Sequence, residues 1–540
     1  MKNTDGGNTQ AAEAEELNKQ DFRMEDFCKE AISLLLMAYL FVIFAMFPFY
    51  MQNGYVEIGR SKYFLYRDVT IGAFCLIIPL AVLGVILRCV REKRVRLAKK
   101  LSVTDWAVLL YGISVLASYL LSDFQKDALW GENGWYMGLI TQLLFVLSYF
   151  LVSRFWEYDT KILYAAMLAS AAVFLLGLLN RFSIYPFAVE GANNGFISTM
   201  GNINWYCGYW AVFFPMGVML YWFADKLHLR LAGLLLTAVG TATGVSQGSN
   251  SAFLVFGGVY LLLFCLSFRD GKRMQRFLEL LILSCLVCQG LRFYRILFPV
   301  SFNYYEGSFC DWITRSSLSL YALVPLAFLY LLLILNNRKS GGNMARYKML
   351  RQITLLLLTI TAGVYVFLLT INTMTEGGIR FMGEVSVLRF NILWGSSRGG
   401  TWKAGVDLFQ KLPWEKKLTG VGPDSFAMYL YSLPDIRKVV MKQFGQSRLT
   451  NAHNEWLSVL VNNGIFGLIS YAGIFVSAVT RFLYRAERSF NSGFLYLFAA
   501  SVFAYTLHNM VSFQQILSTP FIFLLLAIGE RYLRERQGSS

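Results

Sequence analysis

The sequence predicts an all-α, polytopic membrane protein with about 14 transmembrane helices. Of its 540 residues, 56% are hydrophobic and only 15% are charged, whereas soluble domains carry about a quarter charged residues. The apolar residues also gather in long runs, and a run of about 18 or more with few charges is typical of a membrane-spanning helix. Such runs lie near 31–50, 69–90, 105–122, 137–153, 162–180, 205–223, 230–246, 252–268, 277–298, 318–335, 352–371, 464–482, 493–511 and 518–531.

Basic residues in the connections predict the orientation. The short basic connections are 91–100, 269–276, 336–351, 481–488 and 531–536. With fourteen spans and a cytoplasmic N-terminus, all of them fall on the cytoplasmic side, as the positive-inside rule expects. This asymmetry explains much of the net charge of +16, so no nucleic-acid partner is expected.

The chain is expected to divide into membrane segments, two tails and one long outer loop. The predicted parts are a cytoplasmic tail over 1–30, eleven transmembrane helices over 31–371, an extracytoplasmic loop over 372–463, three transmembrane helices over 464–531 and a cytoplasmic tail over 532–540. A long loop among tight ones is usually functional or disordered. The aromatic residues of this loop argue for an ordered, helical domain on the outer face.

Three short helices are expected in this loop. The pattern predicts them from Thr401 to Phe409, from about Asp424 to Leu433 and from near Asn451. Between 372 and 455, eleven Lys and Arg outnumber seven Asp and Glu. This excess of cations is consistent with bulk surface charge and equally with a site for an anionic substrate.

His453 is the main candidate for chemistry. Thr450 or Asn451 is expected to cap the helix that follows, which places His453 in its first turn. The positive end of the helix dipole keeps an imidazole neutral, as a general base requires, and also attracts phosphate. The alternative is an interfacial histidine that only hydrogen-bonds a neighbour. The adjacent Asn454 is a candidate substrate-binding residue.

Arg398 is the second candidate, because a guanidinium in a Ser/Gly-rich turn before a helix suits phosphate binding. Its alternative is a solvated loop arginine. Trp402 and Lys403 follow it closely and are candidate substrate-binding residues, although lysines in this loop are surface charge by default.

Three further polar residues lie near the outer ends of predicted spans. Asn204, Gln247 and His508 are expected to line a cleft, although turn and interface roles explain Asn204 and Gln247 equally well. Several motifs are absent from the sequence. It holds no GxxxxGK[ST] and no HExxH, and its one Cys-x-x-Cys, Cys285–Cys288, lies inside an apolar run, so neither an ATP-driven pump nor a zinc site is expected.

Two segments together resemble the signature region of the O-antigen ligase/polymerase superfamily. They are SSRGGTWKAGVDLFQKLPWEKKLTGVGPDSF and, further on, NAHNEWLSVLVNNGIFGLISYAGIF. The shared pattern is an Arg before a Trp, a Gly-x-Gly turn and a His-Asn helix that enters a span through Gly-x-x-Gly. The resemblance covers about 395–480 well, and the rest of the chain agrees only in hydropathy.

The resemblance implies a GT-C-like membrane glycosyltransferase of the bacterial cytoplasmic (inner) membrane. Members of the superfamily transfer a glycan from a polyprenyl diphosphate carrier to a hydroxyl of an acceptor glycan or lipid-linked sugar, at the outer face and in contact with membrane lipid. Neither a cofactor nor a metal is implied. The family's histidine, which assists the acceptor hydroxyl, maps to His453, and its diphosphate-binding arginine maps to Arg398.

The chain departs from the family pattern at the end of the seventh predicted span. Members often carry Ser-Arg-Gly/Ala there, and that arginine also handles diphosphate. Here the run is Ser246–Ser249 with Gln247 in the arginine's place. Either Arg292, Arg295 or Arg315 substitutes, or Arg398 and helix ends suffice.

The sequence is compatible with three functions. The first is an inverting, metal-independent glycan polymerase or O-antigen-type ligase. The second is a transporter or flippase of lipid-linked glycans, which fourteen spans would suit. The third is a non-catalytic envelope scaffold. Transporters usually show internal repeats and intramembrane charges, and this sequence shows no clear repeat.

Overall fold

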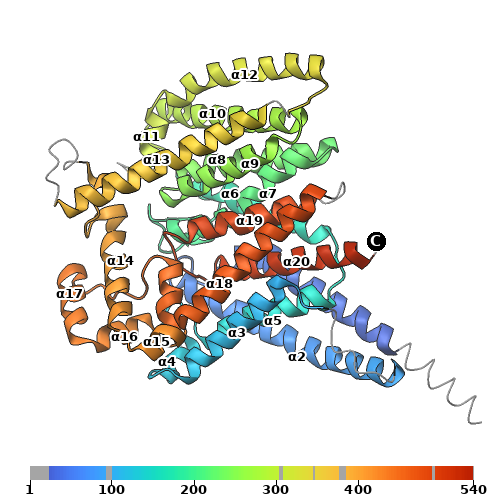
Figure 1. Cartoon of the computed structure of the whole chain (residues 1–540), viewed down its shortest axis with the longest axis vertical. Coiled ribbons are helices and arrows are strands. Elements are labelled where there is room, and N and C mark those ends of the chain that lie inside the picture. The colour runs from blue at the N-terminus through green and yellow to red at the C-terminus, as the bar shows by residue number, and fades with distance from the viewer. Residues whose placement is uncertain are drawn as a thin grey trace, which may run out of the picture.

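The computed structural model describes residues 24–92, 100–302, 308–344, 347–375, 385–488 and 493–538. Long helices run side by side, and a layer of short helices covers one end of the bundle (Figure 1). The helical bounds are Met24–Phe49, α2 (Ile58–Glu92), α3 (Val103–Leu120), α4 (Gln125–Trp130), α5 (Leu139–Phe155), α6 (Lys161–Arg181), α7 (Ile203–Phe223), α8 (Leu227–Ser246), α9 (Ser251–Ser267), α10 (Gly271–Leu297), α11 (Phe309–Arg315), α12 (Leu318–Ser340), α13 (Lys348–Met374), η4 (Ser386–Leu388), α14 (Trp394–Lys411), α15 (Trp414–Thr419), α16 (Phe426–Ser432), α17 (Pro434–Phe444), α18 (Glu455–Arg488), α19 (Gly493–His508) and α20 (Thr519–Gly538).

The all-α class is confirmed. In the described part of the chain, the only strands are β1 (Phe196–Ile197) and β2 (Gly201–Asn202), which pair antiparallel with Phe196 opposite Asn202. Nine of the described helices are long and apolar enough to cross a membrane. Each of the fourteen predicted runs overlaps a helix, whereas a count of fourteen crossings and a GT-C-like arrangement stay predictions.

The first helix differs from the prediction, because residues from Met24 onward, before the expected start near 31, are already helical; residues 1–23 lie outside the described ranges. Its far end unwinds through a π turn, η1 (Val42–Met46), and a 3-10 turn, η2 (Phe47–Phe49). The carbonyls of Phe47 and Pro48 at this end accept hydrogen bonds from the buried amine of Lys62 at 3.0 and 2.9 Å. A buried polar backbone is satisfied in this way.

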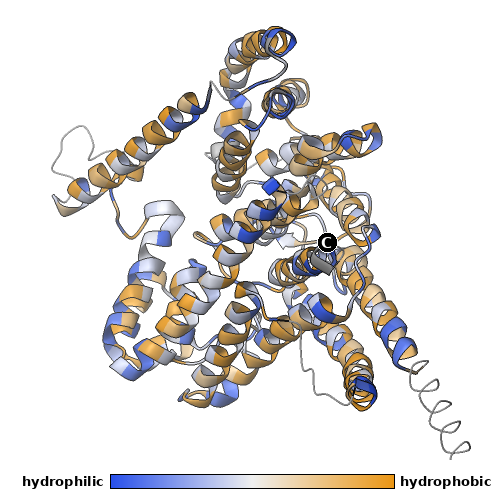
Figure 2. Cartoon of the chain, turned by 45° about the vertical axis from the view of Figure 1, so that its right-hand side comes forward, coloured by the Kyte–Doolittle hydropathy of each residue, from blue (hydrophilic) through white to orange (hydrophobic). Residues whose placement is uncertain are grey.

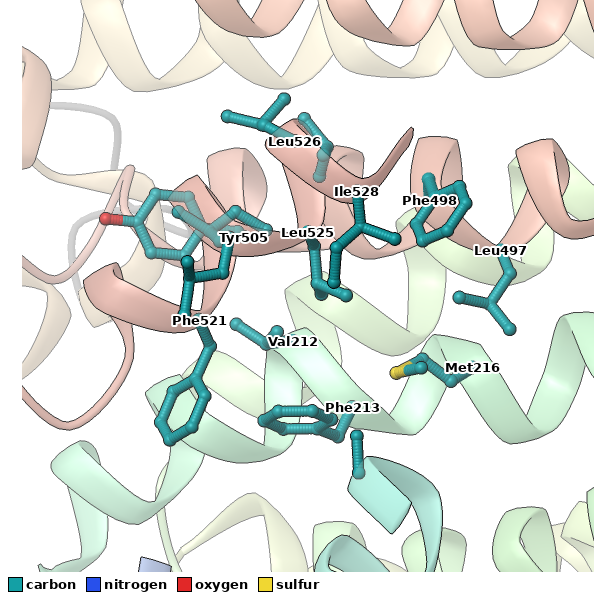
Figure 3. Close-up of a cluster of buried hydrophobic side chains, with 14 of the residues drawn as sticks. Val212, Phe213, Met216, Leu497, Phe498, Tyr505, Phe521, Leu525, Leu526 and Ile528 are labelled. Atoms are coloured by element: carbon teal, nitrogen blue, oxygen red, sulfur yellow. The ribbon is translucent and has the colours of Figure 1, made fainter. Parts of the chain in front are cut away.

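The centre of the bundle is an apolar core formed mainly by α7, α19 and α20. Figure 3 shows Val212, Phe213 and Met216 of α7 facing side chains of α19 and α20. Every residue of α7 from Tyr206 to Trp222 is buried, so this helix is apolar on all sides, as expected of a central helix.

The peripheral helices expose apolar surface. Only 6% of the apolar window of α12 and none of that of α13 is buried, and Figure 2 shows these helices largely orange. An apolar helix face without protein neighbours is suited to lipid contact. Together these observations make the chain a multi-pass membrane protein.

The layer of short helices, α14 to α17 together with η4, is called the cap below. Two of the three predicted loop helices are longer or shifted in the structure: α14 begins at Trp394, and α18 begins at Glu455. The third corresponds to α16, and the sequence reasoning missed α15 and α17. These two are short, so their apolar residues do not form a long run.

The cap docks onto a kink in α18. Gly464 has φ 69° and ψ −171° inside the helix, so the carbonyls of Val461 and Asn462 are released from the helical pattern. They accept the backbone N–H groups of Val421 and Gly422 from the cap at 3.1 and 3.0 Å. The Gly-x-Gly turn (Gly420 and Gly422) and Gly464 of α18 therefore meet at one backbone contact, where a side chain on any of these glycines would not fit.

Candidate functional site

A polar cavity of about 550 Å³ lies between the cap and the membrane helices. The N-terminus of α7, the connection between α8 and α9, the start of α14 and the connection between α17 and α18 form its walls. The lining residues are Ile203, Asn204, Gly248, Ser249, Asn250, Ser308, Ser396, Ser397, Arg398, Thr401, Phe444, Ser447, Arg448, Leu449 and His453.

A break in α14 places Arg398 on this cavity. Gly395, Ser396 and Ser397 have left-handed backbone angles, with φ 61°, 61° and 70°, and the regular helix starts at Arg398. The guanidinium donates from Nε to the carbonyl of Val511 at 2.8 Å and from Nη1 to the carbonyl of Gly395 at 3.0 Å. Among the described residues, Nη2 of Arg398 has no hydrogen-bond partner, so its N–H groups are available to bind an anion.

His453 lines the same cavity from a position just before α18. The predicted first-turn placement is wrong, because Asn454 caps the helix and accepts the backbone N–H of Leu457 at 3.0 Å. His453 itself has φ 49°, a conformation costly for a side chain with Cβ. Its N–H donates to Asn451 Oδ1 at 3.0 Å, and its ring packs edge-on against Phe513 with centroids 5.2 Å apart.

The environment keeps the imidazole of His453 neutral. Burial and the positive charge of Arg398 lower the pKa of His453 to about 4, against a smaller opposing contribution from its hydrogen bond with Asn451. Among the described residues, Nδ1 of His453 is buried and has no hydrogen-bond partner. Sequence reasoning predicted neutrality from the helix dipole, whereas in the structure burial and Arg398 produce it.

The fully charged side chains that line the cavity are cationic. Arg398 and Arg448 both line it, and none of the described lining residues is Asp or Glu. Burial lowers the pKa of Arg398, but a guanidinium stays charged near neutral pH. Hydroxyl and amide side chains form most of the remaining lining, a composition that suits a sugar substrate linked to an anionic group.

Of the other predicted site residues, only Asn204 lines the cavity. Its side-chain oxygen accepts the hydroxyl of Ser249 at 2.7 Å. Gln247 is completely buried at the end of α8, and its backbone carbonyl accepts a hydrogen bond from the buried guanidinium of Arg181. Gln247 therefore lies behind the cavity wall and is not itself exposed to the cavity.

None of the three expected substitutes for a cation at position 247 lies on the cavity. Arg295 and Arg315 both pair with Asp311 at 2.8 Å, and Arg292 contacts Gln289. In the described part of the chain, the cation that contacts Gln247 is Arg181 of α6, which no local sequence pattern connects with that position.

The remaining predicted residues lie around the site. Trp402 donates from Nε1 to the carbonyl of His453 at 3.4 Å, and Asn454 serves as the helix cap. Lys403 is exposed and pairs with Asp407 on its own helix at 3.2 Å. His508 is buried, with Nδ1 2.8 Å from Asn509 Oδ1.

Sequence reasoning missed two charged residues at this site. Arg448 lines the cavity while one edge of its guanidinium binds Glu132, at 2.9 and 3.1 Å. Glu455, completely buried, lies directly behind His453 and Asn454 in the chain. The sequence offered one signal for it, since a carboxylate at the mouth of a membrane helix is unusual.

The fold and the cavity together define a multi-pass, all-α membrane protein with a cationic, hydroxyl-rich site beneath a helical cap. Residues 308–472 match the family model for O-antigen ligase, and no curated protein matches the chain. The matched stretch contains both Arg398 and His453. The match agrees with the resemblance of this region to the O-antigen ligase/polymerase superfamily, and it supports a membrane glycan ligase or polymerase in general.

Proposed function

We propose that this protein transfers a glycan from a polyprenyl diphosphate carrier to the hydroxyl of an acceptor glycan or lipid-linked sugar. The reaction takes place at the outer face of the bacterial cytoplasmic membrane, and the product is an extended polysaccharide or a ligated O-antigen-type glycan. One observation carries the proposal: a guanidinium and a neutral imidazole, Arg398 and His453, share one cavity at the boundary between the cap and the membrane helices.

Arg398 is assigned to the diphosphate. In the transfer step the acceptor oxygen forms a bond to the anomeric carbon of the donor glycan, and the bond from that carbon to the diphosphate oxygen breaks. The leaving diphosphate gains negative charge as this happens, and a preorganised guanidinium stabilises that charge more in the transition state than in the ground state. The charge is thus met by an arginine, and the proposed mechanism uses no metal.

His453 is assigned to the acceptor hydroxyl, whose proton it receives or whose direction it fixes during attack. With a pKa of about 4, the free site holds a neutral but weak base. A bound diphosphate places negative charge nearby, which favours the protonated imidazole and raises its pKa. Binding of the donor therefore turns His453 into a better proton acceptor at the moment it is needed.

The test uses the purified protein in nanodiscs with a polyprenyl-diphosphate oligosaccharide, an acceptor and a chelator. We expect release of polyprenyl diphosphate and growth of the glycan without nucleotide. The new linkage should have the inverted anomeric configuration, because a single direct displacement inverts the reacting carbon. Retention would contradict the mechanism. Movement of the lipid-linked glycan across the bilayer without transfer would instead support the transporter.

A further inference from the structure

The segment Asn509–Phe513, the first half of the connection between α19 and α20, touches both candidate catalytic residues. The carbonyl of Val511 accepts the Nε–H of Arg398 at 2.8 Å. The ring of Phe513 packs edge-on against the imidazole of His453, at 5.2 Å between centroids and 76° between planes. A displacement of this segment would therefore move a contact of the arginine and a contact of the histidine together.

A buried carboxylate anchors the segment at its start. Asn509 donates from Nδ2 to the carboxylate of Glu455, and the backbone N–H of Glu455 donates to the carbonyl of Asn509 at 2.9 Å. Asn509 also holds His508, through Oδ1 at 2.8 Å from Nδ1. Glu455, the first residue of α18, and Asn509, the first residue after α19, therefore each donate one hydrogen bond to the other.

Neutral donors satisfy the carboxylate of Glu455. The hydroxyl of Tyr471, further along α18, donates to it, and the hydroxyl of Tyr505 lies 3.4 and 3.3 Å from its two oxygens. In the described part of the chain no Lys or Arg forms an ion pair with Glu455. A buried carboxyl group is costly unless its oxygens are hydrogen-bonded, so its donors hold one well-defined arrangement.

We propose that Glu455 is a positioning residue of the transfer site, which acts by holding Asn509–Phe513 against Arg398 and His453. The proposal rests on the function proposed above. Glu455 does not line the cavity, so it acts through the segment and touches no substrate. It also fixes the start of α18, directly after the left-handed backbone of His453.

The chain offers a matched control for a purely structural role. Glu279 on α10 is also a carboxylate held by neutral donors, from Tyr221 at 2.5 Å, Tyr330 at 2.9 Å and Gln275 at 2.9 Å. It forms no part of the cavity lining. Glu279→Gln therefore perturbs a similar cluster without touching the site.

The first measurement is a histidine NMR titration in nanodiscs, with the protein labelled at histidine Cε1. The three histidines give three resonances, and that of His453 is assigned by its loss in His453→Gln. In Glu455→Gln we expect this resonance to shift and its titration midpoint to rise above the wild-type value of about 4, because the ring loses its packing. An unchanged resonance would overturn the proposal, and Glu279→Gln should leave it unchanged.

The second measurement is the rate of glycan transfer by the same variants. Glu455→Gln should lower kcat about 100-fold, the size expected when a catalytic group is misplaced by about an ångström, while Glu279→Gln stays near wild type. Equal rates in the two variants would overturn the proposal. The NMR titration does not depend on turnover. If the wild type transfers no glycan, that result contradicts the proposed function, and the titration still tests whether Glu455 positions His453.

A second variant is decisive if Glu455→Gln does not fold. Phe513→Leu leaves the Glu455 hydrogen bonds in place and removes only the ring against His453. It should reproduce both the shift of the His453 resonance and a loss of transfer rate. Wild-type behaviour in Phe513→Leu would show that the segment does not position the histidine.

Discussion

At the scale of single residues, the electrostatics of the cavity depend on His453 and Arg398. Burial and the guanidinium charge act in the same direction on the imidazole. The ring is therefore uncharged at neutral pH, and protonation on acidification opposes its use as a base. Free-enzyme activity that needs the neutral ring should persist well below pH 6.5 and fall as the pH approaches the pKa of His453.

The charge coupling between these two residues is directly testable. Arg398→Gln removes the positive charge, so the pKa of His453 should rise from about 4 but stay below the usual value of about 6.5, since burial remains. The measurement is the NMR titration of the histidine ring. Lys403→Gln serves as control, because Lys403 is exposed and paired with Asp407. An equal midpoint in Arg398→Gln and wild type would contradict the coupling.

Sequence reasoning selected Arg398, His453 and Asn204, which the structure brings to one cavity. It did not find the role of Glu455, although that residue stands two positions after His453. Its partners Tyr471, Tyr505 and Asn509 come from α18, from α19 and from the segment that follows α19. No spacing within one element connects these residues, so only the packing of helices reveals the cluster.

At the scale of elements, the kink of α18 joins the cap to the membrane helices. A methyl group at Gly464 would overlap the carbonyl oxygen of Leu418 and the backbone of Gly420, and φ there is 69°. The glycine is therefore required for two reasons: the backbone angle itself and the close approach of the cap.

Gly464→Ala should destabilise the protein and reduce transfer. The strained backbone alone costs roughly 1–3 kcal/mol, and the overlap with Leu418 adds to it. Thermal unfolding in detergent measures the loss, with Gly473→Ala of the same helix as the matched control. A Cβ at Gly473 meets only Ala107 at 3.5 Å, an ordinary contact. Equal melting temperatures for the two variants would show that the cap does not depend on the kink.

The sequence predicted the membrane helices better than it predicted helix starts and the contacts between elements. Long apolar runs identified the membrane helices, because hydrophobicity over many residues is a strong signal. The start of α18 was placed too early, since Asn451 and Asn454 are both good caps and only the hydrogen bond to Leu457 distinguishes them. The docking of Val421 and Gly422 onto α18 is a non-local contact that the motif alone did not reveal.

At the scale of the whole molecule, the cap and the C-terminal end of α20 lie at opposite ends of the bundle (Figure 1). The basic segments predicted to be cytoplasmic include 269–276, at the start of α10, and 481–488, at the C-terminal end of α18. The proposed orientation therefore puts the cavity on the extracytoplasmic side, where a lipid-linked donor would meet it.

Cysteine labelling tests this orientation. In a background with the eight native cysteines replaced by Ser, Gln446→Cys should react with a membrane-impermeant thiol reagent in right-side-out vesicles. Lys226→Cys, in the connection between α7 and α8, should react only after the vesicles are opened. Both positions are exposed, so accessibility within the protein is matched. The reverse pattern would place the cap in the cytoplasm and contradict the proposed site of reaction.

The most direct test of the transfer site is the turnover rate of two histidine variants with a polyprenyl-diphosphate oligosaccharide and an acceptor. His453 lines the cavity, whereas His228 is exposed at the start of α8, away from the cavity lining. His453→Gln should retain the fold and lower kcat by about 100-fold or more, the usual contribution of a general base, while His228→Gln should match wild type. Full activity in folded His453→Gln would show that the histidine does not take part in the reaction and would contradict the proposed mechanism.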